Sequence, residues 1–143
     1  MNLMSDRFFI DTNIFVYSFD KSDTKKQETA KGIISHALDT FSGCISYQVI
    51  QEFLNVATQK FKIPLTRNDC HKYLEDILAP LCEIFSSINL YKDALEIKEG
   101  WQYSFYDSVI IGATLYADCK ILYSEDLQHQ QTINSLTIVN PFL

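Results

Sequence analysis

The chain has 143 residues and a formal net charge of −6, and 47% of its residues are hydrophobic. That length and apolar content suffice for one domain with a buried core, and they exclude a disordered or low-complexity chain. No apolar run reaches the roughly 18–20 residues of a membrane span, and the opening residues MNLMSDR lack the pattern of a signal peptide. We therefore expect a single domain over residues 1–143, cytoplasmic and without a membrane partner.

Predicted strands and helices alternate along the chain. Short apolar runs rich in strand formers are separated by segments with one apolar face at helical spacing. The pattern predicts strands at 8–10, 43–46, 82–86, 120–124 and 136–140, and helices at 23–40, 47–61, 66–81, 90–100 and 106–119. Such alternation is typical of right-handed crossovers. We therefore expect an α/β fold with a central, mainly parallel sheet flanked by helices.

Four acidic residues fall where such a sheet binds ligands, at the carboxyl ends of its strands. Asp11 directly follows the first predicted strand, and Asp126 follows the fourth. Glu52 lies in the second turn of the helix after the second strand, at the border of its apolar stripe, and Asp107 lies near the start of the 106–119 helix. Each acid alone is compatible with a turn or a helix cap. Together they indicate an acidic cluster at one rim of the sheet.

An acidic cluster of this kind needs counter-charge. Two carboxylates about 4 Å apart repel by roughly 4 kcal/mol at an effective dielectric constant of 20, so four ionised ones require cations or raised pKa values. Mg²⁺ prefers a few carboxylates, retained water and substrate phosphate. A bound cation also reverses the local charge that a phosphodiester meets. The acidity of the chain therefore does not exclude a nucleic-acid substrate.

Four segments, "FFIDTNIFVYSFD", "ISYQVIQEFLNV", "YSFYDSVIIGATL" and "ILYSEDLQ", resemble the PIN-domain nucleases, and within them the VapC-like toxins of type II toxin–antitoxin pairs. The resemblance implies a PIN-like three-layer fold and a Mg²⁺- or Mn²⁺-dependent endoribonuclease with one or two ions. It also implies that Asn13 orients an acid and that a small hydroxyl residue precedes the last acid. Carried over by position, the implied metal-binding acids are Asp11, Glu52, Asp107 and Asp126, and the hydroxyl residue is Ser124.

The same resemblance implies an RNA substrate, a homodimer and an antitoxin protein that covers the acidic groove. The alternatives are a housekeeping RNA-processing nuclease, a DNA-directed PIN nuclease and a non-catalytic nucleic-acid-binding module. A phosphatase of the haloacid dehalogenase type needs a second Asp two residues after Asp11, where this chain has Asn13. Glu125, next to Asp126, could either face the metal or point to solvent. No motif identifies His71 or His129 as a general base.

The basic residues are distributed unevenly. Residues 1–72 carry nine Lys and Arg against eight acids, whereas residues 73–143 carry three against ten. Lys60, Lys62 and Arg67 lie close together in the first half. A solvated surface is the simplest interpretation of such a cluster, and a footprint for phosphate is the alternative.

Overall fold

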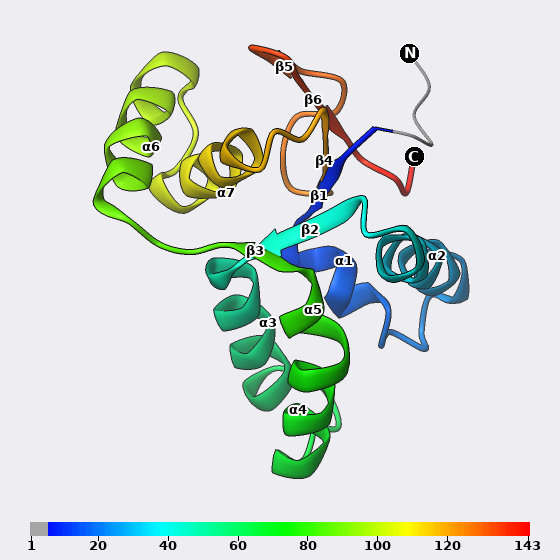
Figure 1. Ribbon diagram of the computed structural model, residues 1–143. Coiled ribbons are helices and arrows are strands. Elements are labelled where there is room, and N and C mark those ends of the chain that lie inside the picture. The colour runs from blue at the N-terminus through cyan, green and yellow to red at the C-terminus, as the bar shows by residue number, and fades with distance from the viewer. Residues whose placement is uncertain (1–5) are drawn as a thin grey trace.

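A computed structural model of the chain describes residues 6–143, so the first five residues of the MNLMSDR stretch lie outside the described residues. Strands and helices alternate along it (Figure 1). The strands are β1 (Phe8–Ile10), β2 (Gly43–Ser46), β3 (Cys82–Ile84), β4 (Ile121–Tyr123), β5 (Thr132–Ile133) and β6 (Leu136–Val139). The helices are α1 (Thr12–Tyr17), α2 (Thr24–Thr40), α3 (Tyr47–Gln59), α4 (Arg67–Tyr73), η1 (Leu74–Leu78), α5 (Ala79–Leu81), α6 (Ile88–Trp101) and α7 (Phe105–Tyr116).

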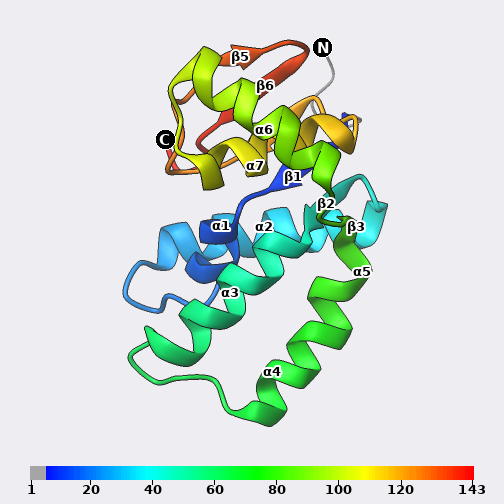
Figure 2. The same cartoon turned by 90° about the vertical axis from the view of Figure 1, so that its left-hand side faces the viewer.

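The strands form one mainly parallel sheet in the order β3-β2-β1-β4-β6-β5, which confirms the predicted fold class. β1 lies at its centre and pairs in parallel with both β2 and β4, and only the short β5 is antiparallel to its neighbour β6. Helices α6 and α7 lie on one side of the strands and α2 on the other (Figure 1). Helix α3 and the α4–α5 segment extend away from the sheet (Figure 2). No helix within residues 6–143 is long and apolar enough to cross a membrane.

An apolar core fixes the elements that carry the predicted site residues. Every residue of β1 is buried, and Phe15 of α1 and Phe53 of α3 have no exposed surface. Their rings meet edge to face with centroids 6.3 Å apart, and Phe53 also stacks on Tyr73 of α4 at 5.0 Å. Because each fully buried side chain of this size stabilises the fold by roughly 1.5–3 kcal/mol, these contacts hold α1, α3 and α4 firmly together.

The structure differs from the sequence prediction at three places. Residues 12–17 form a helix that was not predicted, and β5 is a two-residue strand that was not predicted either. The predicted 66–81 helix contains a π-helical turn, in which the N–H of Ala79 bonds to the carbonyl of Leu74, five residues earlier. Pro80 follows directly, and a proline ring clashes with the carbonyl four residues before it in a regular helix. The wider turn accommodates that ring.

Candidate active site

All four predicted acids line one cleft of about 520 Å³ at the carboxyl end of β1. They come from different elements: the residue after β1, helix α3, the first turn of α7 and the loop after β4. Asn13 also lines the cleft, and Ser124 is buried beside it. The cleft is lined by Asp11, Thr12, Asn13, Val16, Tyr17, Glu52, Asn55, Val56, Lys60, Asp107, Ile110, Glu125 and Asp126.

Asp11 is the most enclosed of these acids, with 6% of its surface exposed. It is the N-cap of α1, and its Oδ1 accepts a hydrogen bond of 2.7 Å from the Thr12 N–H. Its Oδ2 accepts a second bond of 2.7 Å from the Ser124 hydroxyl. Burial raises the pKa of Asp11 to about 7, the carboxylates of Glu52 and Asp126 add to the rise, and the two hydrogen bonds oppose it. Asp11 is therefore both a helix cap and a destabilised carboxylate.

Glu52 is held by two neighbours that the sequence analysis did not single out. The Thr12 hydroxyl donates to Glu52 Oε1 over 2.6 Å, and the side-chain amide of Gln48 lies 3.4 Å from Oε2. The same amide donates to the backbone carbonyl of Tyr106 over 3.1 Å, which links α3 to the start of α7. Gln48 is four residues before Glu52, one helical turn away, so its spacing was a signal in the sequence.

Asp126 is oriented by the segments that follow β1 and β4. The Asn13 side-chain amide donates to Asp126 Oδ2 over 3.0 Å, and the Asp126 N–H donates to the Ser124 hydroxyl over 3.2 Å. The carbonyl oxygen of the Asn13 side chain is buried and has no hydrogen-bond partner among the described residues. The Ser124 hydroxyl thus connects Asp11 and Asp126, and Asn13 leaves one oxygen free.

Asp107 occupies the third position of α7, where its N–H donates to the hydroxyl of Ser104 over 3.1 Å. Ser104 is the helix cap, so the capping role that an acid near a helix start can have does not belong to Asp107. Its side chain is half-buried, and within residues 6–143 no hydrogen bond occupies its carboxylate. Asp107 is therefore available to bind a ligand in the cleft.

Residues 8–133 match the family model of the PIN domain. The chain belongs to the PIN domain family. No match is found among curated proteins. The fold is similar to three solved structures at 15–17% identity, a level at which the likeness shows the fold alone.

The first of these structures is a toxin–antitoxin complex from Klebsiella pneumoniae, with a TM-score of 0.63 and 15% identity over 93% of this chain and 96% of that one. The second is VapC20 from Mycobacterium tuberculosis, described as a toxin that cleaves the sarcin–ricin loop (TM-score 0.61, 15% identity, 82% and 88% covered). The third is VapBC2 from Rickettsia felis bound to promoter DNA (TM-score 0.61, 17% identity, 92% and 96% covered).

Glu125 of this PIN domain neither faces the centre of the acidic group nor points freely into solvent. Its carboxylate pairs with the Lys26 ammonium of α2 over 2.6 Å. Burial alone would raise the pKa of Glu125, but its hydrogen bonds, above all that from Lys26, outweigh this effect and lower it. Lys26 also lies over the ring of Tyr17, 4.5 Å from its centroid. Glu125 is therefore a neutralised part of the cleft wall.

The two histidines left open in the sequence lie outside the PIN cleft. His71 is exposed on α4, and His129 accepts a 2.9 Å hydrogen bond from the Asn140 N–H through its Nδ1. Neither is among the residues that line the cleft. A general-base role for either histidine finds no geometric support.

The donor set of the PIN cleft fits a hard divalent cation. It offers carboxylate oxygens, a buried carboxylate whose ionised form is disfavoured, and the unpaired side-chain oxygen of Asn13. Within residues 6–143 no three His, Cys, Asp or Glu side chains converge closely enough to chelate one ion. Mg²⁺ keeps several waters and takes one or two carboxylates directly, so its binding does not require three chelating side chains.

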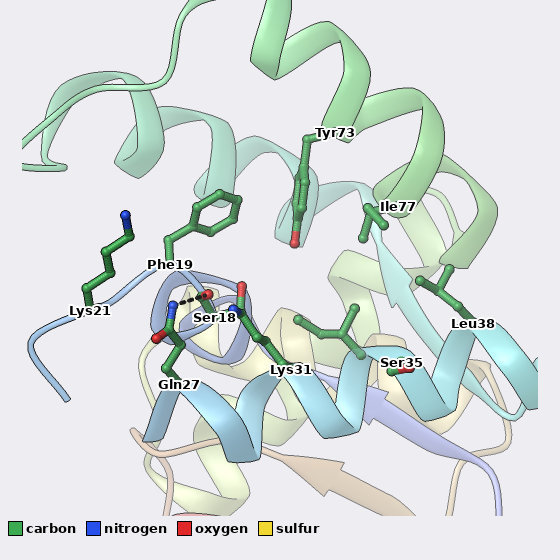
Figure 3. Close-up of a pocket in the computed structure, with 10 residues that line it drawn as sticks. Ser18, Phe19, Lys21, Gln27, Lys31, Ser35, Leu38, Tyr73 and Ile77 are labelled. Carbon is green, nitrogen blue, oxygen red and sulfur yellow. Dashed lines mark hydrogen bonds between the residues drawn. The ribbon is translucent and has the colours of Figure 1, made fainter. Parts of the chain in front are cut away.

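A second cavity of about 450 Å³ lies between α2 and the α4–η1 segment. Phe19, Tyr73 and Ile77 face it from one side, and Lys31 and Leu38 of α2 lie on the other (Figure 3). No carboxylate is among its lining residues. This cavity therefore cannot bind a hard cation through carboxylates as the acidic cleft can.

The Ser124 hydroxyl provides a test of how the acids are held. We expect Ser124→Ala to destabilise the protein by about 1–3 kcal/mol, because a buried Asp11 oxygen loses its donor. Ser108→Ala is the matched control, since this buried hydroxyl bonds only to the carbonyl of Ser104 one turn earlier in its own helix. Chemical denaturation of both variants measures the difference. Equal losses would contradict the role assigned to Ser124.

Proposed function

We propose that this PIN domain is a metal-dependent endoribonuclease and the toxin of a toxin–antitoxin pair. The observation that carries the proposal is the convergence on one cleft of four acids from separate elements, the buried Asp11 among them. Membership of the PIN family and the likeness to toxin structures support it. Hydrolysis of phosphodiester bonds is the chemistry that such a site favours.

We assign the main metal-binding role to Asp11 and Asp107, with Glu52 and Asp126 acting directly or through water. Thr12, Asn13 and Ser124 orient three of these carboxylates through the hydrogen bonds described above. When bound, Mg²⁺ or Mn²⁺ would polarise a phosphate oxygen and lower the pKa of water. The carboxylates position the attacking water in line with the scissile bond, and Asn13 keeps Asp126 in place beside it.

Attack by water predicts products with a 5′ phosphate and a 3′ hydroxyl. The metal-free route through a 2′,3′-cyclic phosphate needs positioned acid–base groups such as a pair of histidines. The described cleft has no histidine in its lining. The chemical groups at the product ends therefore distinguish attack by water from the metal-free route.

The decisive experiment is incubation of the purified protein with end-labelled single-stranded RNA in Mg²⁺, in Mn²⁺ and in a chelator. We expect cleavage in either metal and none in the chelator, with ligatable 5′-phosphate products. DNA of the same sequence is run in parallel, because only a contact to the 2′-hydroxyl separates the two substrates. Preferred cleavage of DNA would favour the DNA-directed alternative, and binding without cleavage of either would favour the non-catalytic one.

We further propose an antitoxin partner that inhibits the enzyme by placing a basic side chain between Asp107 and Glu52. Of the three similar structures, that from K. pneumoniae is a toxin–antitoxin complex, and VapBC2 from R. felis is bound to promoter DNA. Co-expression with the product of the adjacent reading frame should give a tight complex with suppressed cleavage. A complex that cuts RNA as fast as the free protein would contradict this inhibitory role.

A homodimer is part of the same proposal. Helix α6 exposes Ile88, Tyr91 and Leu95 at positions i, i+3 and i+7 of one face, with 70%, 37% and 54% of their surfaces accessible. Apolar side chains gathered on one helix are typical of an interface. Light scattering of the purified protein should give twice the monomer mass, and a monomer mass at all concentrations would contradict the dimer.

A further inference from the structure

The acidic cleft contains one basic side chain among its described lining residues, that of Lys60. All other charged side chains that line the cleft are carboxylates. Glu125 already has Lys26 as its partner, but Lys60 makes no salt bridge within residues 6–143. A free ammonium at the margin of a site for a phosphate polymer requires its own explanation.

Lys60 shares one face of α3 with the predicted metal site. It is the C-cap that directly follows α3, and Glu52, Asn55 and Val56 of that helix also line the cleft. Glu52 and Lys60 lie eight positions apart, which corresponds to about 12 Å along the helix axis at roughly 1.5 Å per residue. This separation leaves room for Lys60 to contact a different phosphate of the strand from the one at the acids.

The surface beyond Lys60 is also basic. Lys62 and Arg67 lie in and just after the loop that follows α3, and both are exposed without a salt bridge within the described residues. Together with Lys60 they form the basic cluster noted in the sequence. Unlike Lys60, neither lines the cleft. The sign of the charge thus changes along α3, from acidic at Glu52 to basic at its C-terminal end.

We propose that Lys60 binds a backbone phosphate of the substrate strand outside the metal site, so that the cleft face of α3 positions the strand from the acids toward the α3–α4 loop. The proposal rests on the proposed nuclease function and extends it to how the substrate is held. Asn55, which is exposed on the same face, lies between the two ends and offers a neutral amide. Metal offsets the carboxylates for one phosphate only, and Lys60 supplies attraction for a second.

The test compares Lys60→Gln with Lys62→Gln. Binding of a fluorescent single-stranded RNA is measured by anisotropy over a series of salt concentrations, in Ca²⁺ in place of Mg²⁺, with gel analysis to verify intact RNA. Loss of one phosphate contact should lower the slope of log Kd against log salt by about 0.7 in the Lys60 variant. At low salt its Kd should rise about three- to fivefold, the scale of one exposed ion pair. Lys62→Gln, a nearby exposed lysine outside the cleft, should show less than half of both changes.

The outcomes separate this proposal from the nuclease function. Equal slopes for the two variants would show that both lysines act through the general positive charge of this surface, not through a specific phosphate contact, and would overturn the role of Lys60. An unchanged slope in the Lys60 variant would overturn it as well, even if the wild type cleaves RNA. A Lys60-dependent slope in a protein that never cleaves RNA would support the phosphate contact and remove the proposed catalytic function.

Discussion

Asp107→Asn is expected to lower the rate of RNA cleavage in Mg²⁺ by at least about two orders of magnitude and to leave the fold intact. Loss of one essential electrostatic group has this scale in enzymes. The substitution keeps the size of the side chain and the hydrogen bond from its N–H to Ser104, but it removes the charge that a cation needs. Single-turnover cleavage measures the loss, and circular dichroism measures the fold.

Asp69→Asn is a closely matched control for this substitution. Asp69 also occupies the third position of a helix, α4, and its N–H also donates to a capping hydroxyl, that of Thr66, over 3.1 Å. It does not line the cleft, so its replacement should leave cleavage within about twofold of wild type.

Asp11→Asn should lose as much activity as Asp107→Asn, and the double variant little more, because groups that act as a unit are non-additive. Normal cleavage by both single variants would refute the assigned site.

Asp11→Asn is expected to stabilise the metal-free protein at about pH 8, although it abolishes activity. Burial raises the pKa of Asp11 from 3.8 to about 7, so the folded state binds the proton more tightly than the unfolded state. The cost of the ionised carboxylate is therefore complete above pH 7 and disappears as the pH falls from 7 toward 4. It amounts to roughly 4 kcal/mol at most, since one pKa unit corresponds to about 1.4 kcal/mol. Asn retains the capping ability at this position.

Thermal melts of both proteins between about pH 5 and pH 8 measure this difference. The advantage of the variant should be largest at the alkaline end and should shrink as the pH falls. Millimolar Mg²⁺ should raise the melting temperature of the wild type by mass action on the folded state, and that of the variant less. A wild-type melting curve that responds to neither pH in this window nor metal would contradict a strained carboxylate at Asp11.

The fold class was predictable because its signal is periodic. Helical stripes and short apolar runs alternate over the whole chain, and the parallel sheet follows from that alternation. Helix α1 was missed because six residues are too few to display a period, and its start is marked only by Asp11, which the site also uses. The two-residue β5 depends on tertiary packing and has no pattern of its own in the sequence. The π turn was missed although Pro80, inside the predicted 66–81 helix, was a signal for a break in the regular helix.

The grouping of the four acids in one cleft was predictable from topology, because each follows a strand or lies near the start of a helix at the same rim. Their partners were less accessible to sequence reasoning. The bond from Thr12 to Glu52 joins residues 40 positions apart, and that from Asn13 to Asp126 joins residues 113 apart. The pairing of Glu125 with Lys26 spans 99 positions. Such contacts depend on how side chains are placed in three dimensions. No periodic pattern in a single sequence links residues at these separations, so the contacts could not be predicted from it.

The pairing register of β1 and β4 sets half of the cleft by itself. Ile10 lies opposite Tyr123, and the Asp11 N–H donates to the Tyr123 carbonyl over 3.0 Å. The tripeptides 11–13 and 124–126 therefore leave the sheet side by side, and the bonds from Ser124 to Asp11 and from Asn13 to Asp126 follow from that alignment. A slip of one residue would turn every side chain of the pair to the opposite face. For protein design, the register of this strand pair is therefore a property to preserve whenever the cleft is altered, because two of the four carboxylates take their places from it.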